Sequence, residues 1–215
     1  MGLLLHSVKM DWPVLLPIFL CSILVVAVAI RKCYFYQHNK RDIKDFIPRL
    51  QKELAKGNME MAQSLSVQLG GIIGEVTEEA IRIFNEQRDG FSRSFDIAAN
   101  LASRKLEEDL TILGTIGGVA PFLGLFGTVV RILYTFQDLA VQGNQSAAVA
   151  MGIGSALIAT AFGLGVAIVA VILFNTFQST VKRFEDDFML IKLLFLSFTD
   201  SKEETVKTSS VNEMI

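Results

Sequence analysis

The sequence has 215 residues, of which 51% are hydrophobic, and its 20 basic and 22 acidic residues give a formal net charge of −2. A composition this apolar, with the apolar residues gathered in long runs, is typical of a membrane protein. The near-neutral charge argues against a nucleic-acid-binding protein, which would need a strongly basic surface.

The first apolar run predicts a membrane anchor near the amino terminus. We expect residues 1–11 to be a short periplasmic N-terminus and residues 12–30 to form transmembrane helix 1. Arg31 and Lys32 follow this run directly, whereas a cleavable signal carries its positive charge before the apolar core. By the positive-inside rule, the amino terminus lies outside and the chain from residue 31 onward enters the cytoplasm.

Residues 31–110 balance acidic and basic side chains and are predicted to form a cytoplasmic helical segment. Helices are expected over 42–56 and 59–69, separated by Gly57 and Asn58. Proline suits a first helical turn, so Pro48 would also allow the first helix to start at Phe46 or Ile47. A long third helix is expected to run from Ile72 into the membrane at Thr111, with Gly90 as its weak point.

Three consecutive acids, Glu107, Glu108 and Asp109, end this segment just before the next apolar run. They allow two interpretations: a charged ring at the cytoplasmic mouth of an oligomeric channel, or an ordinary acidic turn at the membrane interface. The second interpretation is the default for such a turn.

The carboxyl-terminal half predicts two further crossings. We expect transmembrane helix 2 over 111–135, a short periplasmic loop over 136–146 and transmembrane helix 3 over 147–178. A cytoplasmic helical extension should follow over 179–198, and the polar residues 199–215 should be disordered. The fold class is therefore an all-α membrane protein, with three transmembrane helices and long helices that extend into a cytoplasmic helical domain.

Helices 2 and 3 each place small residues on one side and large apolar residues on the other. Small residues mark close helix contacts inside lipid, so we expect these faces to pack, most simply between several copies of the chain. The small-residue positions that we expect to pack and to line a pore are Gly117, Pro121, Gly124, Gly152, Ala156, Ala159, Gly163 and Ala167.

Neither helix contains an acid or a histidine in residues 111–130 or 147–181, although a proton path through a membrane normally needs a titratable group. The hydroxyls of Thr128, Ser155 and Thr160 are the candidate ion-path groups. Each could instead bond back to the carbonyl one turn earlier, and Arg131 could either reach the headgroups or pair with an acid.

No enzyme constellation is visible. The two histidines lie on opposite sides of the predicted membrane, the two cysteines form no CxxC pair, and there is no GxxxxGK phosphate loop. We expect no catalysis, no cofactor and no metal.

Two blocks carry a family resemblance: APFLGLFGTV within residues 113–136 and ALIATAFGL within residues 152–175. With the three crossings, they resemble the ExbB/TolQ/MotA proton-channel family, closest to its ExbB and TolQ branch. The resemblance implies a homo-oligomer, a pentamer, around two copies of an ExbD/TolR-like single-pass partner in the bacterial inner membrane. The partner's aspartate would carry protons, Thr128 and Thr160 would face the pore, and ion flow would drive mechanical work on the envelope.

The sequence departs from the family pattern at two positions. Ser155 stands where ExbB and TolQ typically have a glutamate, and Val169 stands where they typically have a proline. The first departure weakens the case for a relay shared with the partner, and leaves the partner's acid as the main proton carrier. The second removes an expected kink from helix 3.

Two other functions remain open at this stage. One is a non-conducting membrane scaffold that assembles around a single-pass partner. The other is a flagellar-stator-like motor subunit, although that branch normally has a fourth crossing.

Overall fold

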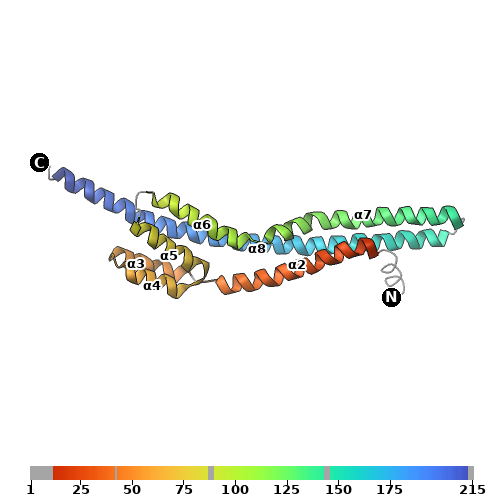
Figure 1. The fold of residues 1–215 in the computed structure, drawn as a ribbon, viewed down its shortest axis with the longest axis horizontal. Coiled ribbons are helices and arrows are strands. Elements are labelled where there is room, and N and C mark those ends of the chain that lie inside the picture. Colours follow the sequence, from red (N-terminus) through yellow and green to blue (C-terminus); the bar gives the residue numbers. More distant parts are fainter. Residues whose placement is uncertain (1–11, 42, 87–89, 143–145, 213–215) are drawn as a thin grey trace. The chain divides into compact units, whose positions relative to one another are not determined.

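The computed structural model describes the backbone of residues 12–41, 43–86, 90–142 and 146–212. The side chains of Trp12–Val14, Asp138, 140–142, 146–148 and 200–212 lie outside the description. No β-strand is present in the described ranges, and the helices are labelled in Figure 1. They are α2 (Trp12–Asn39), α3 (Ile43–Ala55), α4 (Met59–Leu69), α5 (Gly71–Glu86), α6 (Phe91–Glu107), α7 (Leu110–Gln142) and α8 (Ser146–Asn212).

Three of the described helices, α2, α7 and α8, are long and apolar enough to cross a membrane. Their candidate spans lie within Leu15–Asn39, Leu110–Gln137 and Val149–Thr199. The predicted fold class is therefore confirmed: the chain is an all-α membrane protein with three candidate transmembrane helices.

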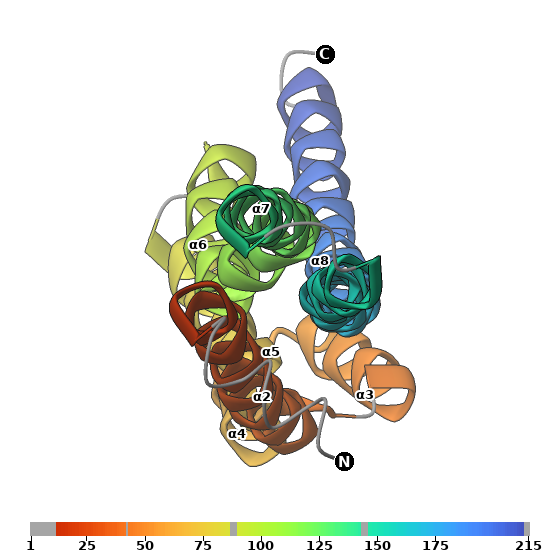
Figure 2. The ribbon, with the colours of Figure 1, turned by 90° about the vertical axis from the view of Figure 1, so that its right-hand side faces the viewer.

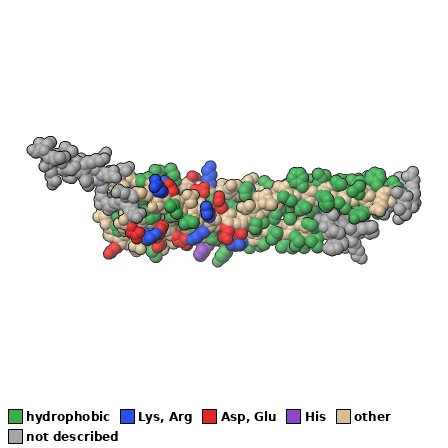
Figure 3. Space-filling view, turned by 45° about the horizontal axis from the view of Figure 1, so that its top comes forward, with side chains coloured by type: hydrophobic (Ala, Val, Ile, Leu, Met, Phe, Trp, Pro, Cys, Tyr) green, Lys and Arg blue, Asp and Glu red, His purple; other side chains and the backbone are tan. Residues whose placement is uncertain are grey.

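The chain divides into two compact units. One, which we call the transmembrane unit, comprises Met1–Cys33 and Asp109–Gln178. The other, which we call the bundle unit, comprises Tyr34–Glu108 and Ser179–Ile215. On the face drawn in Figure 3, hydrophobic side chains gather over the first unit and charged side chains over the second.

In the transmembrane unit, α7 and α8 lie side by side and run antiparallel (Figures 1 and 2). The order of their contacts shows the direction, because Gly114 faces Phe174 whereas Gly152 faces Thr135. The helix α2 buries Ile18, Val25 and Val28, which share one side of it, and leaves most of its other apolar residues exposed.

In the bundle unit, α3, α4 and α5 pack in succession, each against the next. Asn58 caps the start of α4 by accepting a hydrogen bond from the backbone N–H of Met61 at 3.1 Å. Gly70 and Gly71, with φ of 63° and 64°, turn the chain between α4 and α5, a conformation that glycine adopts without strain. A Cβ on Gly74 would lie 2.7 Å from the carbonyl oxygen of Ser66, so α4 and α5 approach closely there.

Aromatic side chains fill the core between α5, α6 and α8. The ring of Phe195 lies 5.5 Å from the rings of both Phe84 and Phe91, and Phe91 lies 5.7 Å from Phe95. Asp96 on α6 accepts hydrogen bonds from the Lys192 ammonium of α8 at 2.7 and 2.8 Å, beside this core. Tyr36 ties the end of α2 to the same unit, donating its hydroxyl proton to the Leu106 carbonyl at 2.7 Å.

The expected helix from Ile72 through Thr111 is wrong, because the chain breaks twice in that stretch. The first break lies at Gly90, which has a φ of 105° and precedes α6. The second follows Glu107, where Glu108 leaves the helical conformation and Asp109 has a φ of 65°. Gly90 was the expected weak point, whereas a left-handed aspartate gives no comparable signal in the sequence.

Other boundaries agree with expectation only in part. The helix α4 has the predicted bounds, and α3 lies within one residue of the expected 42–56 at each end, so the later start that Pro48 allowed is wrong. The helix α7 continues to Gln142, so helix occupies part of the expected loop over 136–146. The helix α8 carries helical backbone to Asn212, and the expected disorder of 199–215 stays a prediction.

Candidate functional site

The small residues of α7 and α8 pack these two helices against each other within one chain. A Cβ on Gly163 would lie 2.6 Å from the Ala120 carbonyl oxygen and 3.0 Å from the Gly124 Cα. A Cβ on Gly124 would lie 2.9 Å from the Thr160 Cα. Because these neighbours are backbone atoms, neither position has room for a larger side chain at this helix separation.

The same close approach recurs toward both ends of the pair. A Cβ on Gly117 would lie 2.7 Å from a methyl group of Val171, and one on Gly152 would lie 2.3 Å from the Thr135 hydroxyl. From the sequence, we expected these faces to pack first between copies of the chain. At these glycines, however, α7 and α8 of the same chain pack against each other. Of the other small positions, Ala156, Ala159 and Ala167 are buried and Pro121 is half-buried. Their role in lining a pore stays a prediction.

Large apolar residues point away from this contact. Phe122, Phe126 and Leu133 of α7 are each more than 60% exposed, and Phe162 and Ile168 of α8 are more than 55% exposed. A surface of this kind suits lipid or another membrane helix, since neither penalises exposed hydrocarbon. The division between a small inner face and a large outer face is therefore present in the structure.

Thr160 makes a polar contact between the two helices where Gly124 and Gly163 approach closely. Its hydroxyl donates to the Gly124 carbonyl oxygen across the helix pair at 2.9 Å, and its side chain is half-buried. A hydroxyl has one proton and two lone pairs, so Thr160 can still accept a hydrogen bond after making this one. It could accept from water or from a protonated carboxyl group.

Thr128 behaves differently from Thr160. It is only 8% exposed, and its hydroxyl donates to the Leu125 carbonyl of its own helix at 2.7 Å. This is the back-bonding that threonine commonly makes in membrane helices. The sequence placed both threonines in the ion path, and the structure gives Thr160 the more accessible hydroxyl of the two.

Ser155 is buried and lies at the centre of a small polar network. Its hydroxyl donates to the Gly152 carbonyl at 2.9 Å and accepts from the Arg131 Nε at 3.1 Å. From the sequence, Arg131 was expected to reach the headgroups or to pair with an acid, and its contact with Ser155 was not predicted. The signal was available, because an antiparallel hairpin brings residue 131 opposite the start of the next helix.

The three acids of the expected mouth have different surroundings. Asp109 lies in the transmembrane unit and forms an ion pair with Arg31, the carboxylate Oδ2 lying 2.7 Å from Nη1. Glu107 and Glu108 belong to the bundle unit and have exposed side chains. The ion pair gives Asp109 a structural role, as in the interfacial interpretation, and a charged mouth stays a prediction.

Comparison with known proteins identifies the family. The family model described as the MotA/TolQ/ExbB proton channel family matches residues 68–189, more than half of the chain. This match includes α6, nearly the whole of the α7–α8 contact and all three candidate hydroxyls. The chain belongs to this family.

Curated relatives point to its ExbB and TolQ branch. The Tol-Pal system protein TolQ of Pseudomonas aeruginosa is 47% identical over 92 residues, which are 42% of this chain and 40% of that protein. The biopolymer transport protein ExbB of Pseudomonas putida is 29% identical over 182 residues, 80% of this chain and 54% of that protein. The ExbB of Salmonella typhimurium is 40% identical over 101 residues, 46% of this chain and 41% of that protein. The chain thus spans about half the length of these relatives.

Membership of the ExbB/TolQ branch and three apolar helices together support a multi-pass inner-membrane protein of a proton-channel family. This family is one of channels and energy transduction rather than a class of enzymes. The Arg131–Ser155 contact includes the serine for which the resemblance led us to expect a glutamate.

Proposed function

We propose that this chain is the membrane subunit of a proton-motive-force-driven motor or channel of the ExbB/TolQ type. The observation that carries the proposal is that the family match spans both α7 and α8, with Thr160 hydrogen-bonded between them. Ion flow through the assembly would be coupled to mechanical work on the envelope. One charge that moves through 100 mV releases about 2.3 kcal/mol, so several protons could drive a conformational step.

The proton-carrying acid would come from a partner. Residues 111–130 of α7 and 147–181 of α8 contain no acid or histidine, so within these two stretches the side chains that could contact a moving proton are hydroxyls. We propose a pentamer of this chain around two copies of an ExbD/TolR-like single-pass protein, whose membrane aspartate would reach the level of Thr160. The half-buried Thr160 oxygen would accept a hydrogen bond from that aspartate when it is protonated.

Proton flux through a reconstituted complex tests this role. The chain is purified with a small single-pass protein encoded beside it that carries an aspartate early in its membrane helix, and stoichiometry is measured by native mass spectrometry. The complex is then placed in vesicles that contain a pH-sensitive dye. Thr160→Val keeps the side-chain shape and removes the hydroxyl, so we expect it to abolish flux without dissociating the complex.

Thr176→Val is the matched control, because Thr176 lies on the same helix and its exposed hydroxyl donates to the Ile172 carbonyl at 2.7 Å. Flux should survive this change. If Thr160→Val and Thr176→Val conduct equally well, the proposed path is wrong.

A non-conducting scaffold is the second candidate, and one observation favours it. The protons of Thr128, Ser155 and Thr160 are all donated to carbonyl oxygens inside the helix pair. A scaffold would assemble with the same partner in the same stoichiometry, but it would show no flux even as the natural sequence. The flux of the unmodified complex therefore separates the two functions.

We also propose that the amino terminus is periplasmic and the carboxyl terminus cytoplasmic, on the strength of the positive charges that follow residue 30. Cys33 has an exposed side chain and tests this orientation. A membrane-impermeant maleimide should label it in inverted vesicles but not in intact cells with a permeabilised outer membrane. Labelling of intact cells would reverse the topology.

A further inference from the structure

A cavity of about 270 Å³ lies inside the bundle unit, where α2 ends and α8 passes. The end of α2 and the segment after it form one wall, α8 forms another, and α5 contributes one residue. The lining residues are Tyr36, Gln37, Lys40, Arg41, Ile73, Thr180, Arg183, Phe184 and Asp187.

The charge of this cavity favours an anion. Lys40, Arg41 and Arg183 contribute three positive side chains, against one carboxylate from Asp187. Among the described residues, neither Lys40 nor Arg183 has a carboxylate within salt-bridge distance. The lining residues therefore carry more positive than negative charge.

The orientation of Arg41 is fixed. Its Nε donates to the Leu69 carbonyl oxygen at 2.9 Å, at the end of α4. This bond uses one of the five guanidinium donors and holds the group in place. An arginine held in this way can present its terminal amines to a phosphate or carboxylate.

The floor of the cavity is apolar. Tyr36, Ile73 and Phe184 are each at most 6% exposed, and the Tyr36 hydroxyl is already bonded to the Leu106 carbonyl. Specific recognition of a ligand would thus fall to the basic groups, while the floor would contact hydrocarbon. A cavity with a charged rim and an apolar floor suits an amphipathic anion better than a fully hydrated one.

The helices place this cavity near the edge of the bilayer. On α2, Tyr36 is six residues beyond Ile30, the last residue of the apolar run, which is about 9 Å of helix rise. On α8, Arg183 follows directly after the uncharged run that ends at Val181. The headgroup layer adds roughly 5–8 Å to each side of the hydrocarbon core, so Arg183 comes level with lipid phosphates. Lys40 is ten residues, or about 15 Å of helix rise, beyond Ile30 and would reach back toward that level with its long side chain.

We propose that this cavity binds the phosphate of an anionic phospholipid headgroup, with Lys40, Arg41 and Arg183 as its ligands. Basic pockets beside membrane helices are the usual form of such sites. The shared chemistry is a phosphate group, which could also come from a soluble ion. The inference does not depend on proton conduction and would stand if the proposed function failed.

Lipid binding to the full-length chain tests the proposal. Phosphatidylglycerol or phosphatidylcholine is titrated into the purified protein in neutral detergent, and bound lipid is counted by native mass spectrometry. We expect phosphatidylglycerol to be retained in preference to phosphatidylcholine. Arg183→Gln should weaken its binding about tenfold, the loss expected for one charge-assisted contact.

Lys182→Gln is the matched control. Lys182 precedes Arg183 on α8, carries the same charge at the same membrane level and does not line the cavity. General attraction to an anionic surface would weaken binding about fivefold for either variant. A preferential loss in Arg183→Gln supports the cavity, and an equal loss in both variants overturns it.

Competition with soluble phosphates tests whether the bound phosphate group belongs to a lipid headgroup or to a soluble ion. Inorganic phosphate and glycerol phosphate are added as competitors at the concentration that half-saturates phosphatidylglycerol. Failure to displace the lipid supports a headgroup site that uses the apolar floor. Displacement at matched concentration overturns the lipid source and leaves a site for soluble phosphate. Both substituted side chains are exposed, and unchanged helical circular dichroism verifies that each variant is folded.

Discussion

The two units use opposite side-chain sizes at their helix contacts. In the transmembrane unit, Gly124 and Gly163 make a close helix contact, and Phe122 is 70% exposed. In the bundle unit, Phe91 and Phe195 are at most 1% exposed and form the core. Small residues thus form the contact between α7 and α8, whereas large aromatic residues fill the core between α5, α6 and α8.

The difference in side-chain size follows from the solvent: the bundle unit packs its helices in water, and the transmembrane unit packs them in lipid. In water, burial of a large apolar side chain is strongly favourable, so aromatic residues collect between helices. In lipid, that force between helices is nearly absent, and stability comes from close backbone approach and interhelical hydrogen bonds. The Thr160 hydrogen bond to the Gly124 carbonyl is of the second kind.

The largest effect should come from removing an aromatic side chain in the bundle unit. Phe195 is fully buried and contacts the rings of Phe84 and Phe91, so Phe195→Ala should cost about 3–5 kcal/mol. Hydrogen exchange of residues 34–108 in the detergent-solubilised chain measures this loss. Met189→Ala on the same helix is the control, since Met189 is exposed and its loss should change little. If the backbone amides were equally protected from exchange in Phe195→Ala and Met189→Ala, the aromatic residues would not form the stabilising core.

Adding a side chain at a glycine contact should destabilise the transmembrane unit. Gly163→Ala adds a Cβ that would lie 2.6 Å from the Ala120 carbonyl oxygen, so α7 and α8 must separate at a cost of about 1–3 kcal/mol. Gly165→Ala is a close control, because a Cβ there meets nothing within 4 Å. In thermal unfolding in detergent, the midpoint temperature should be lower for Gly163→Ala alone. A comparable drop for Gly165→Ala would show that helix propensity, rather than contact, sets the effect.

The sequence predicted those parts of the fold in which one local signal dominates. Long uncharged runs identified the three apolar helices, and Asn58 with Gly57 identified the start of α4. The small faces of α7 and α8 were also recognised. Their partner was assigned first to other copies, because a helical wheel gives the direction of a face without saying which chain covers it.

Tertiary contacts account for the features that the sequence did not predict. The left-handed Asp109 ends the path from α6 into α7, and its carboxylate pairs with Arg31, 78 residues earlier. The Arg131–Ser155 contact likewise depends on the register of two helices. In the candidate site, the family motif located Thr128 and Thr160, but only geometry distinguishes the accessible hydroxyl from the buried one.

A smaller effect is expected where a polar side chain joins two helices of the bundle unit. Asn39 is buried, donates to the Phe35 carbonyl and accepts from the Ile72 N–H at 3.2 Å, at the start of α5. Asn39→Ala leaves that N–H without this partner and should cost about 1 kcal/mol. Hydrogen exchange at the first turn of α5 measures the change. Asn39→Asp keeps an acceptor at this position and should retain most of the protection, so an equal loss in both variants would exclude capping as the cause.

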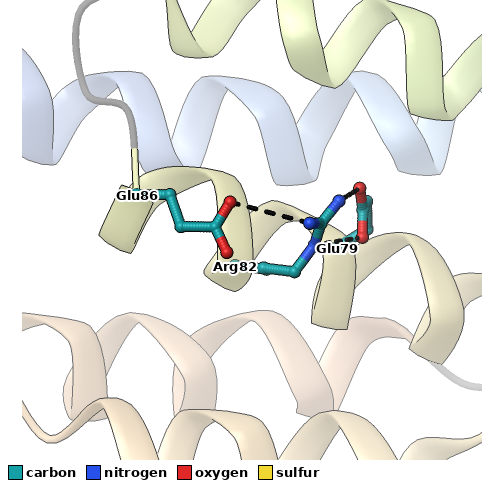
Figure 4. Close-up of polar contacts among 3 residues, drawn as sticks. All are labelled: Glu79, Arg82 and Glu86. Atoms are coloured by element: carbon teal, nitrogen blue, oxygen red, sulfur yellow. Dashed lines mark hydrogen bonds and ion pairs between the residues drawn. The ribbon is translucent and has the colours of Figure 1, made fainter.

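The smallest effect is expected at the surface of α5, where Arg82 contacts Glu79 and Glu86 (Figure 4). The hydrogen bond from Arg82 is the main reason that the pKa of the Glu79 carboxyl is lowered, and burial opposes it. A lowered pKa stabilises the fold above the ordinary carboxyl pKa, and this contribution disappears as the pH falls through the lowered value. All three side chains face solvent, so the contribution is small and screened by salt. Arg82→Gln should therefore lower the unfolding midpoint slightly at neutral pH, and the difference from the natural sequence should vanish in acid and in high salt. A difference that persists in high salt would mean that Arg82 acts through packing of its hydrocarbon stem instead of through its charge.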